Sequence, residues 1–180
     1  MNVNEILNRS LALLGIHDAV VAAGTTDARV LNLVTALGVT YVRLITEYAP
    51  LEREAQISVS GGSFDASTLP ETIFDAVRLS DEAGKPVSFR LRGHTLLAED
   101  GAYTLRYYAL PASYPQIGGT VEVAPQITVD LLARGVAAEY AMASMMYEES
   151  LLHERKYKEG LVKAFAPRGA KSLPKVKRWI

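Results

Sequence analysis

The sequence contains no cysteine, only one tryptophan and no long uninterrupted run of apolar residues. The absence of cysteine excludes disulfides, thiolate metal sites and cysteine nucleophiles, and it suits a cytosolic origin. A bilayer-spanning helix needs about 18 to 20 consecutive apolar residues. The first residues, Met1 to Leu14, are interrupted by Asn4, Glu5 and Arg9, so they do not form a secretory segment. We therefore expect a soluble protein that has no membrane association.

The overall net charge of −1 hides a strong separation of charge along the chain. Residues 155–180 hold nine Lys or Arg against one Glu, which gives a net charge of +8. Residues 1–154 hold ten Lys or Arg against nineteen Asp or Glu, which gives −9. An acidic body with a basic end steers association with other molecules, so this pattern bears on partners and not on the fold.

Apolar residues recur at helical spacing in three segments, which predicts helices at about residues 3–14, 26–49 and 127–165. The third segment is either one helix or two. A single helix of that length would extend roughly 55 Å at 1.5 Å per residue, which exceeds the width of such a domain. If the segment forms two helices, the break is expected between residues 144 and 150 or at Gly160.

The stretch at about residues 70–110 has a different pattern, in which apolar and polar residues alternate between turn signals. It predicts an antiparallel meander of three or four strands. The predicted fold class is therefore α+β but mostly helical, a bundle of two N-terminal and one or two C-terminal helices with this small meander inserted. We expect a single domain over residues 1–165 and a basic, extended tail over residues 166–180.

A search for catalytic residues finds no recognisable constellation. His17 and His94 lie in predicted loops, where a solvated histidine is common. His153 is followed by a glutamate, but a zinc-binding helix would need a second histidine at position 157, which is a tyrosine. Neighbouring carboxylates such as Glu148 and Glu149 lie on predicted helix surfaces, where charge is normally solvated. We expect no enzymatic activity, no cofactor and no metal.

The basic end closes with Trp179, the only tryptophan of the chain, and Ile180. Large apolar side chains are unfavourable in a solvated tail but are typical anchors in the groove of a partner protein. Nucleic-acid binding by aromatic stacking would favour several aromatics on a basic surface, and here the body is acidic. A protein partner is therefore the preferred interpretation of this segment.

The order of elements resembles the head–tail adaptor (connector) proteins of tailed bacteriophages, which include tail accessory factors and tubular adaptors. The resemblance covers nearly the whole chain as patterns, without an invariant signature. It is carried by the segments Ile6–Ile16, Leu69–Val77, Phe89–Leu97, Tyr103–Tyr108, Leu131–Ala133, Val136–Tyr140 and Tyr157–Ala164. One departure is that the family often has a tryptophan where the second helix ends, and this chain has Tyr48–Leu51 there.

The resemblance implies a structural virion protein that forms a homo-oligomeric ring, commonly of twelve subunits, at the portal vertex after assembly in the host cytoplasm. The ring would join the portal protein to downstream tail or nozzle proteins and conduct DNA through its lumen without sequence-specific binding. The residues expected to dock in the portal are Arg168, Lys171, Leu173, Lys175, Lys177, Arg178, Trp179 and Ile180. Those expected to contact a neighbouring subunit or tail protein are Arg90, Arg92, His94 and Leu96.

Two other functions stay open at the level of the sequence. The first is a nucleic-acid-binding accessory protein that uses the basic C-terminal end, whose binding would weaken steeply with salt. The second is a small cell-wall hydrolase, which would need a carboxylate pair held in a groove. The acidic body also suggests that DNA would not adhere to a lumen formed by it.

Overall fold

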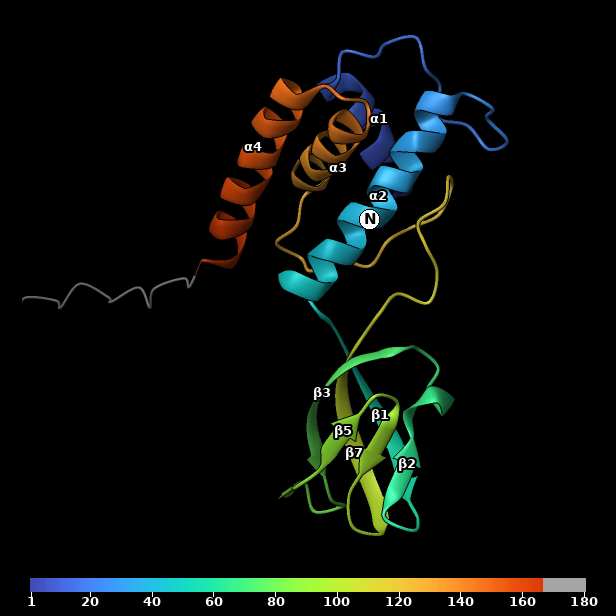
Figure 1. The fold of residues 1–180 in the computed structure, drawn as a ribbon, viewed down its shortest axis with the longest axis vertical. Helices are drawn as coiled ribbons and strands as arrows, with labels where there is room; N and C mark the ends of the chain where they lie inside the picture. The colour runs from blue at the N-terminus through green and yellow to red at the C-terminus, as the bar shows by residue number, and fades with distance from the viewer. Residues whose placement is uncertain (167–180) are drawn as a thin grey trace, which may run out of the picture.

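The chain folds into a helical body and a β module that projects from one end of it (Figure 1). The structure is a computed structural model that describes residues 1–166. The helical body consists of α1 (Val3–Leu13), α2 (Ala28–Glu47), α3 (Val129–Ala143) and α4 (Tyr147–Phe165). The β module, residues 51–109, is inserted between α2 and α3.

The first two helices begin where side chains satisfy amides that have no partner inside the helix. Asn2 accepts a hydrogen bond from the Asn4 amide at 2.8 Å, and Asp27 accepts one from the Arg29 amide at 2.9 Å. Short polar side chains at this position are the preferred start of a helix because they replace water at the exposed N–H groups. Both helices therefore begin within two residues of the predicted positions.

Among the described residues, α2 is the one helix long and apolar enough, by length and composition, to cross a membrane. Half of the window that meets this test is buried inside the fold. Its buried residues, including Leu33, Leu37 and Leu44, pack in the core of the helical body. We therefore interpret α2 as a core helix.

The long C-terminal helical segment is divided into α3 and α4. Thr128 caps the start of α3 by accepting a hydrogen bond from the Leu131 amide at 3.2 Å. The division falls at Ser144–Met146, where Met145 adopts a left-handed backbone with φ of 61°. A left-handed residue cannot continue a right-handed helix, so the break lies at the first of the two places indicated by the sequence.

The helix α3 lies at the centre of the helical body and packs against α1, α2 and α4. Two glycines permit this close packing. A Cβ atom at Gly135 would lie 2.6 Å from Thr40 Cγ2, and one at Gly160 would lie 2.4 Å from Leu131 Cδ1. Both distances are shorter than van der Waals contact, so the interhelical spacing depends on the absence of side chains at these positions.

The β module contains two antiparallel sheets. The first has the order β1 (Leu51–Val59), β7 (Gly101–Ala109), β3 (Ile73–Ser80) and β4 (Pro86–Val87). The second has the order β2 (Ser63–Asp65), β6 (Thr95–Leu97) and β5 (Arg90–Arg92), and a short 3-10 turn, η1 (Ala66–Thr68), follows β2. These strands enclose a core of their own, which is separate from the helical core and includes Ile57, Val59, Leu79, Leu96, Leu105 and Tyr107.

The expectation of a mostly helical bundle with one small meander is wrong. The described residues form four helices and seven strands in two sheets, with about 41% helix and 24% strand. The missed strand β1 contains Glu52, Arg53, Glu54 and Gln56, which obscure its alternation and have good helix propensity. Strand β2, also missed, has three residues, too few for a period of two to be recognised. The predicted meander at residues 70–110 divides between the two sheets, because β5 and β6 pair with β2 and not with β3 and β7.

Candidate interaction surfaces

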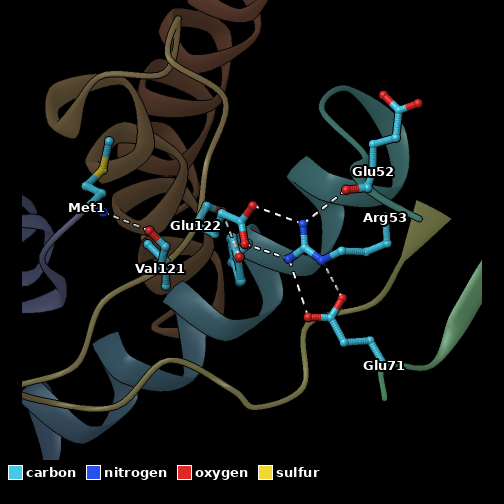
Figure 2. Close-up of polar contacts among 7 residues, drawn as sticks. Met1, Glu52, Arg53, Glu71, Val121 and Glu122 are labelled. Atoms are coloured by element: carbon cyan, nitrogen blue, oxygen red, sulfur yellow. Dashed lines mark hydrogen bonds and ion pairs between the residues drawn. The ribbon is translucent and has the colours of Figure 1, made fainter. Parts of the chain in front are cut away.

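The β module is joined to the helical body by a cluster of charged side chains around Arg53 (Figure 2). Arg53 lies on β1, and its Nε donates to Glu71 Oε2 at 2.7 Å. Its guanidinium also contacts both carboxylate oxygens of Glu122, at 3.1 Å and 2.6 Å. Since Glu71 precedes β3 and Glu122 lies in the connector between β7 and α3, one side chain links three segments distant in sequence.

The connector that carries Glu122 is fixed to the helical body by backbone and side-chain hydrogen bonds. The Tyr41 hydroxyl of α2 donates to the Glu122 carbonyl at 2.8 Å. The amino group of Met1 donates to the Val121 carbonyl at 2.8 Å, and the Val121 amide donates to the Met1 carbonyl at 2.9 Å. The Arg53 cluster is therefore the polar contact through which the helical body holds the β module in its orientation.

The electrostatics of this cluster agree with its geometry. Hydrogen bonding to Arg53 lowers the pKa of the Glu122 carboxyl, and the two carboxylates raise the pKa of the Arg53 guanidinium. Arg53 and Glu71 are about three-quarters buried, with exposed side-chain fractions of 27% and 23%, whereas Glu122 is 60% exposed. The pair with Glu71 is therefore the less screened of the two.

A groove of about 400 Å³ lies in the helical body between α2, α3 and α4. Tyr157 of α4 lines it, and its buried hydroxyl has no hydrogen-bond partner among the described residues. Burial raises the pKa of this hydroxyl, so it remains protonated and available as a donor. The rim carries both signs of charge, with Arg43 facing Glu139 at 3.7 Å and Lys158 facing Glu154 at 2.7 Å.

Beside this groove, α4 and the turn before it expose large apolar side chains to solvent. Met145, Tyr147, Leu151 and Val162 have exposed fractions of 76%, 58%, 61% and 70%. Tyr147, Leu151 and Val162 are separated by 4 and 11 residues, which places them along one face of the helix. We call these three residues the α4 stripe. The helix α4 packs mainly on α3, so its outer face is uncovered in the monomer.

The predicted contact residues of the β module do not form one surface. Arg90 and Arg92 lie exposed on β5, and His94 lies exposed in the turn that follows. Leu96 is fully buried in the core of the β module, so its side chain cannot meet a neighbour. The predicted portal-docking residues, Arg168, Lys171, Leu173, Lys175, Lys177, Arg178, Trp179 and Ile180, lie outside the described residues.

The histidines are widely separated in the fold. His17 is exposed between α1 and α2, whereas His153 is buried on α4, and its Nδ1 atom has no partner within residues 1–166. Burial, together with the charges of Arg134 and Lys156, lowers the pKa of His153. Among the described residues, no group of three or more His, Asp or Glu side chains is arranged to hold a metal ion.

The sequence alone did not indicate the Arg53 cluster. Its acidic members lie 18 and 69 residues from Arg53, Glu71 at the start of the predicted β-rich stretch and Glu122 in a predicted loop. Comparison with models of known protein families and with curated proteins finds no match to this chain.

Proposed function

We propose that the protein is a structural virion subunit, a head–tail adaptor that assembles as a ring between the portal and the tail of a bacteriophage. In this proposal the helical body forms the ring, and the β module projects toward neighbouring subunits or tail proteins. The basic C-terminal segment docks in the portal through Trp179 and Ile180. The protein works by being held between other proteins and carries out no chemical step.

The observation that carries this proposal is the α4 stripe. Its side chains are large and apolar, as is typical of core residues, yet more than half of each is exposed to solvent: Tyr147, Leu151 and Val162. Burial of apolar area is worth about 25 cal/mol per Å², so leaving such side chains in water is unfavourable. Tyr147 and Leu151 lie one turn apart on this face, and clustered exposed apolar side chains mark protein–protein contacts. A second copy of the chain supplies such a contact in a ring.

The charge of the body suits a ring that conducts DNA. Residues 1–154 carry a net charge of −9, and Lys and Arg contacts drive nonspecific binding to phosphates. The turns at the end of the β module distant from the helices are acidic, with Asp81, Glu82, Glu99 and Asp100. We infer that the lumen is lined by acidic surface of residues 1–154. A structure of the assembled ring with a basic lumen would refute this inference.

The proposal is tested by the oligomeric state of two variants that differ by one position. Leu151→Asp places a charge in the α4 stripe. Leu152→Asp places the same charge on the adjacent position, which lies outside the stripe and is also exposed, with an exposed fraction of 51%. Native mass spectrometry of the full chain should show a ring for the wild type and for Leu152→Asp, and monomers for Leu151→Asp. A monomeric wild type at high concentration, without portal, would contradict self-assembly. Rings of unchanged mass in both variants would exclude the stripe as the contact.

A further inference from the structure

A second hollow, of about 380 Å³, lies on another side of α4, between its C-terminal half and the N-terminal half of α3. Its lining includes three basic side chains, Arg134, Lys156 and Lys163, and one acidic side chain, Asp130. Gly160 lies between the two lysines, and its lack of a side chain lets the α4 backbone approach Leu131 of α3. The hollow is therefore bordered by long cationic side chains.

Lys156 and Lys163 are placed to act together. They are seven residues apart, which is two helical turns and about 10 Å along the axis of α4. Neither lies within 4.0 Å of an acidic side chain of residues 1–166. The other cations of α4 differ, since Arg155 pairs with Glu159 at 2.9 Å and Lys158 pairs with Glu154 at 2.7 Å. The two lysines are thus uncompensated where their neighbours on the same helix are paired.

The carboxylate in the hollow does not cancel this charge. Asp130 is in contact with both Arg9 and Arg134, and the Arg134 pair measures 3.0 Å. Hydrogen bonding to Arg9 and Arg134 lowers the pKa of Asp130, so it remains ionised and bound to the two guanidinium groups. Counting Arg9, Arg134, Lys156 and Lys163 against Asp130 gives a local charge of 4 − 1 = +3. This charge stands out on a body with an acidic excess.

We propose that this hollow binds the backbone phosphates of nucleic acid, with Lys156 and Lys163 as the contacts, while Arg134 remains paired with Asp130. Lysine ammonium groups bind phosphate as point charges, and a nucleic-acid strand presents phosphates at regular intervals that suit cations spaced along a helix. Sequence beyond α4 extends the same charge, because residues 167–180 include five Lys or Arg and no Asp or Glu. Gln126 and Thr128 add neutral polar groups to the rim.

This inference does not rest on the adaptor proposal, since it concerns one copy of the chain and a different face of α4. The site lies on the helical body, apart from the acidic turns at the distal end of the β module. Such a contact carries no sequence preference, because phosphates report no base identity.

The test compares two double variants of the full-length chain that lose the same charge. Lys156→Gln/Lys163→Gln removes the uncompensated lysines, and Arg155→Gln/Lys158→Gln removes two paired cations from the same helix. Both retain the basic C-terminal segment, so its contribution is the same in each. Binding to a fluorescent 20-base-pair duplex is measured by anisotropy between 50 and 200 mM NaCl, with native mass spectrometry to confirm equal oligomeric states.

Each phosphate contact contributes about 0.9 to the slope of log affinity against log salt concentration. Loss of Lys156 and Lys163 should make the slope less steep by about 2. Over the fourfold range of salt concentration, the wild type should therefore lose roughly tenfold more affinity than this variant. The control should keep the wild-type slope. Equal slopes for the two double variants would overturn the proposal, since charge alone and not the hollow would then decide binding. Saturation of the hollow by inorganic phosphate without any change in the DNA slope would also overturn it.

Discussion

Replacing Arg53 by methionine removes the charge that joins the β module to the helical body and retains most of the apolar stem. The pair with Glu71 is about three-quarters buried on both sides, and hydrogen bonds to charged groups in such settings contribute about 1.5–3 kcal/mol. The pair with Glu122 is more exposed and belongs to the range of about 0.2–1 kcal/mol. We expect Arg53→Met to lower the free energy of unfolding by about 2–3 kcal/mol in total.

Urea unfolding followed by circular dichroism at pH 7 measures this loss. The matched control is Arg106→Met, because Arg106 also lies on the β1–β7 ladder and faces Glu52 and Glu54, but all three side chains are more than 40% exposed. The control should cost less than about 1 kcal/mol. Losses of equal size in the two variants would refute the argument that burial and linkage of segments give Arg53 its importance.

The same cluster predicts a dependence on pH whose sign follows from the lowered pKa of Glu122. In the unfolded chain this carboxyl has its ordinary value of 4.5, and in the folded protein its pKa is lower. The contribution to stability is therefore complete above pH 4.5 and is lost as the pH falls through the folded value. The difference in stability between the wild type and Arg53→Met should shrink below about pH 4.5. A difference that stays constant down to pH 3 would contradict this assignment.

Two further predictions concern the packing of α4 and the C-terminal segment. Gly160→Ala places a methyl group against Leu131 and should destabilise the protein by about 1–3 kcal/mol in thermal or urea unfolding, whereas no loss would show that the helices separate freely. Deletion of Trp179 and Ile180 should leave the domain folded but weaken its attachment to the portal in a co-sedimentation assay; an unfolded truncated protein would assign these residues to the core instead.

The sequence was most informative where apolar residues repeat over several turns. In α1 and α2 the apolar residues repeat over several turns. The period of 3.6 residues is therefore recognisable even where single positions depart from it. The division between α3 and α4 was visible only as an alternative, because Met145 and its neighbours carry no glycine or proline to mark the turn. The left-handed Met145 closes a local Schellman turn, in which the Met146 amide donates to the Ala141 carbonyl at 2.8 Å and the Met145 amide donates to the Met142 carbonyl at 3.1 Å.

The β module shows the opposite case, because its stability comes from contacts between distant segments. In β1, Glu52, Arg53 and Glu54 precede the buried Ile57, so local composition favours a helix or loop. Pairing with β7 over the full length of the strand overrides that preference. Neither the pairing nor the Arg53 cluster has a local signature, since both join residues separated by tens of positions in the chain.

The point of insertion explains how one chain can present two surfaces that act separately. Leu51 and Ala109 are paired in the β1–β7 ladder, so the chain leaves and re-enters the helical body at a single place. The two hydrophobic cores have no buried residue in common. A structural change at the distal turns of the β module can therefore reach the α4 stripe only through the connectors and Arg53. Among the described residues, Leu51 is the one residue of the β module in the buried core of the helical body, so the α4 stripe and the distal turns can each be altered while the other is kept.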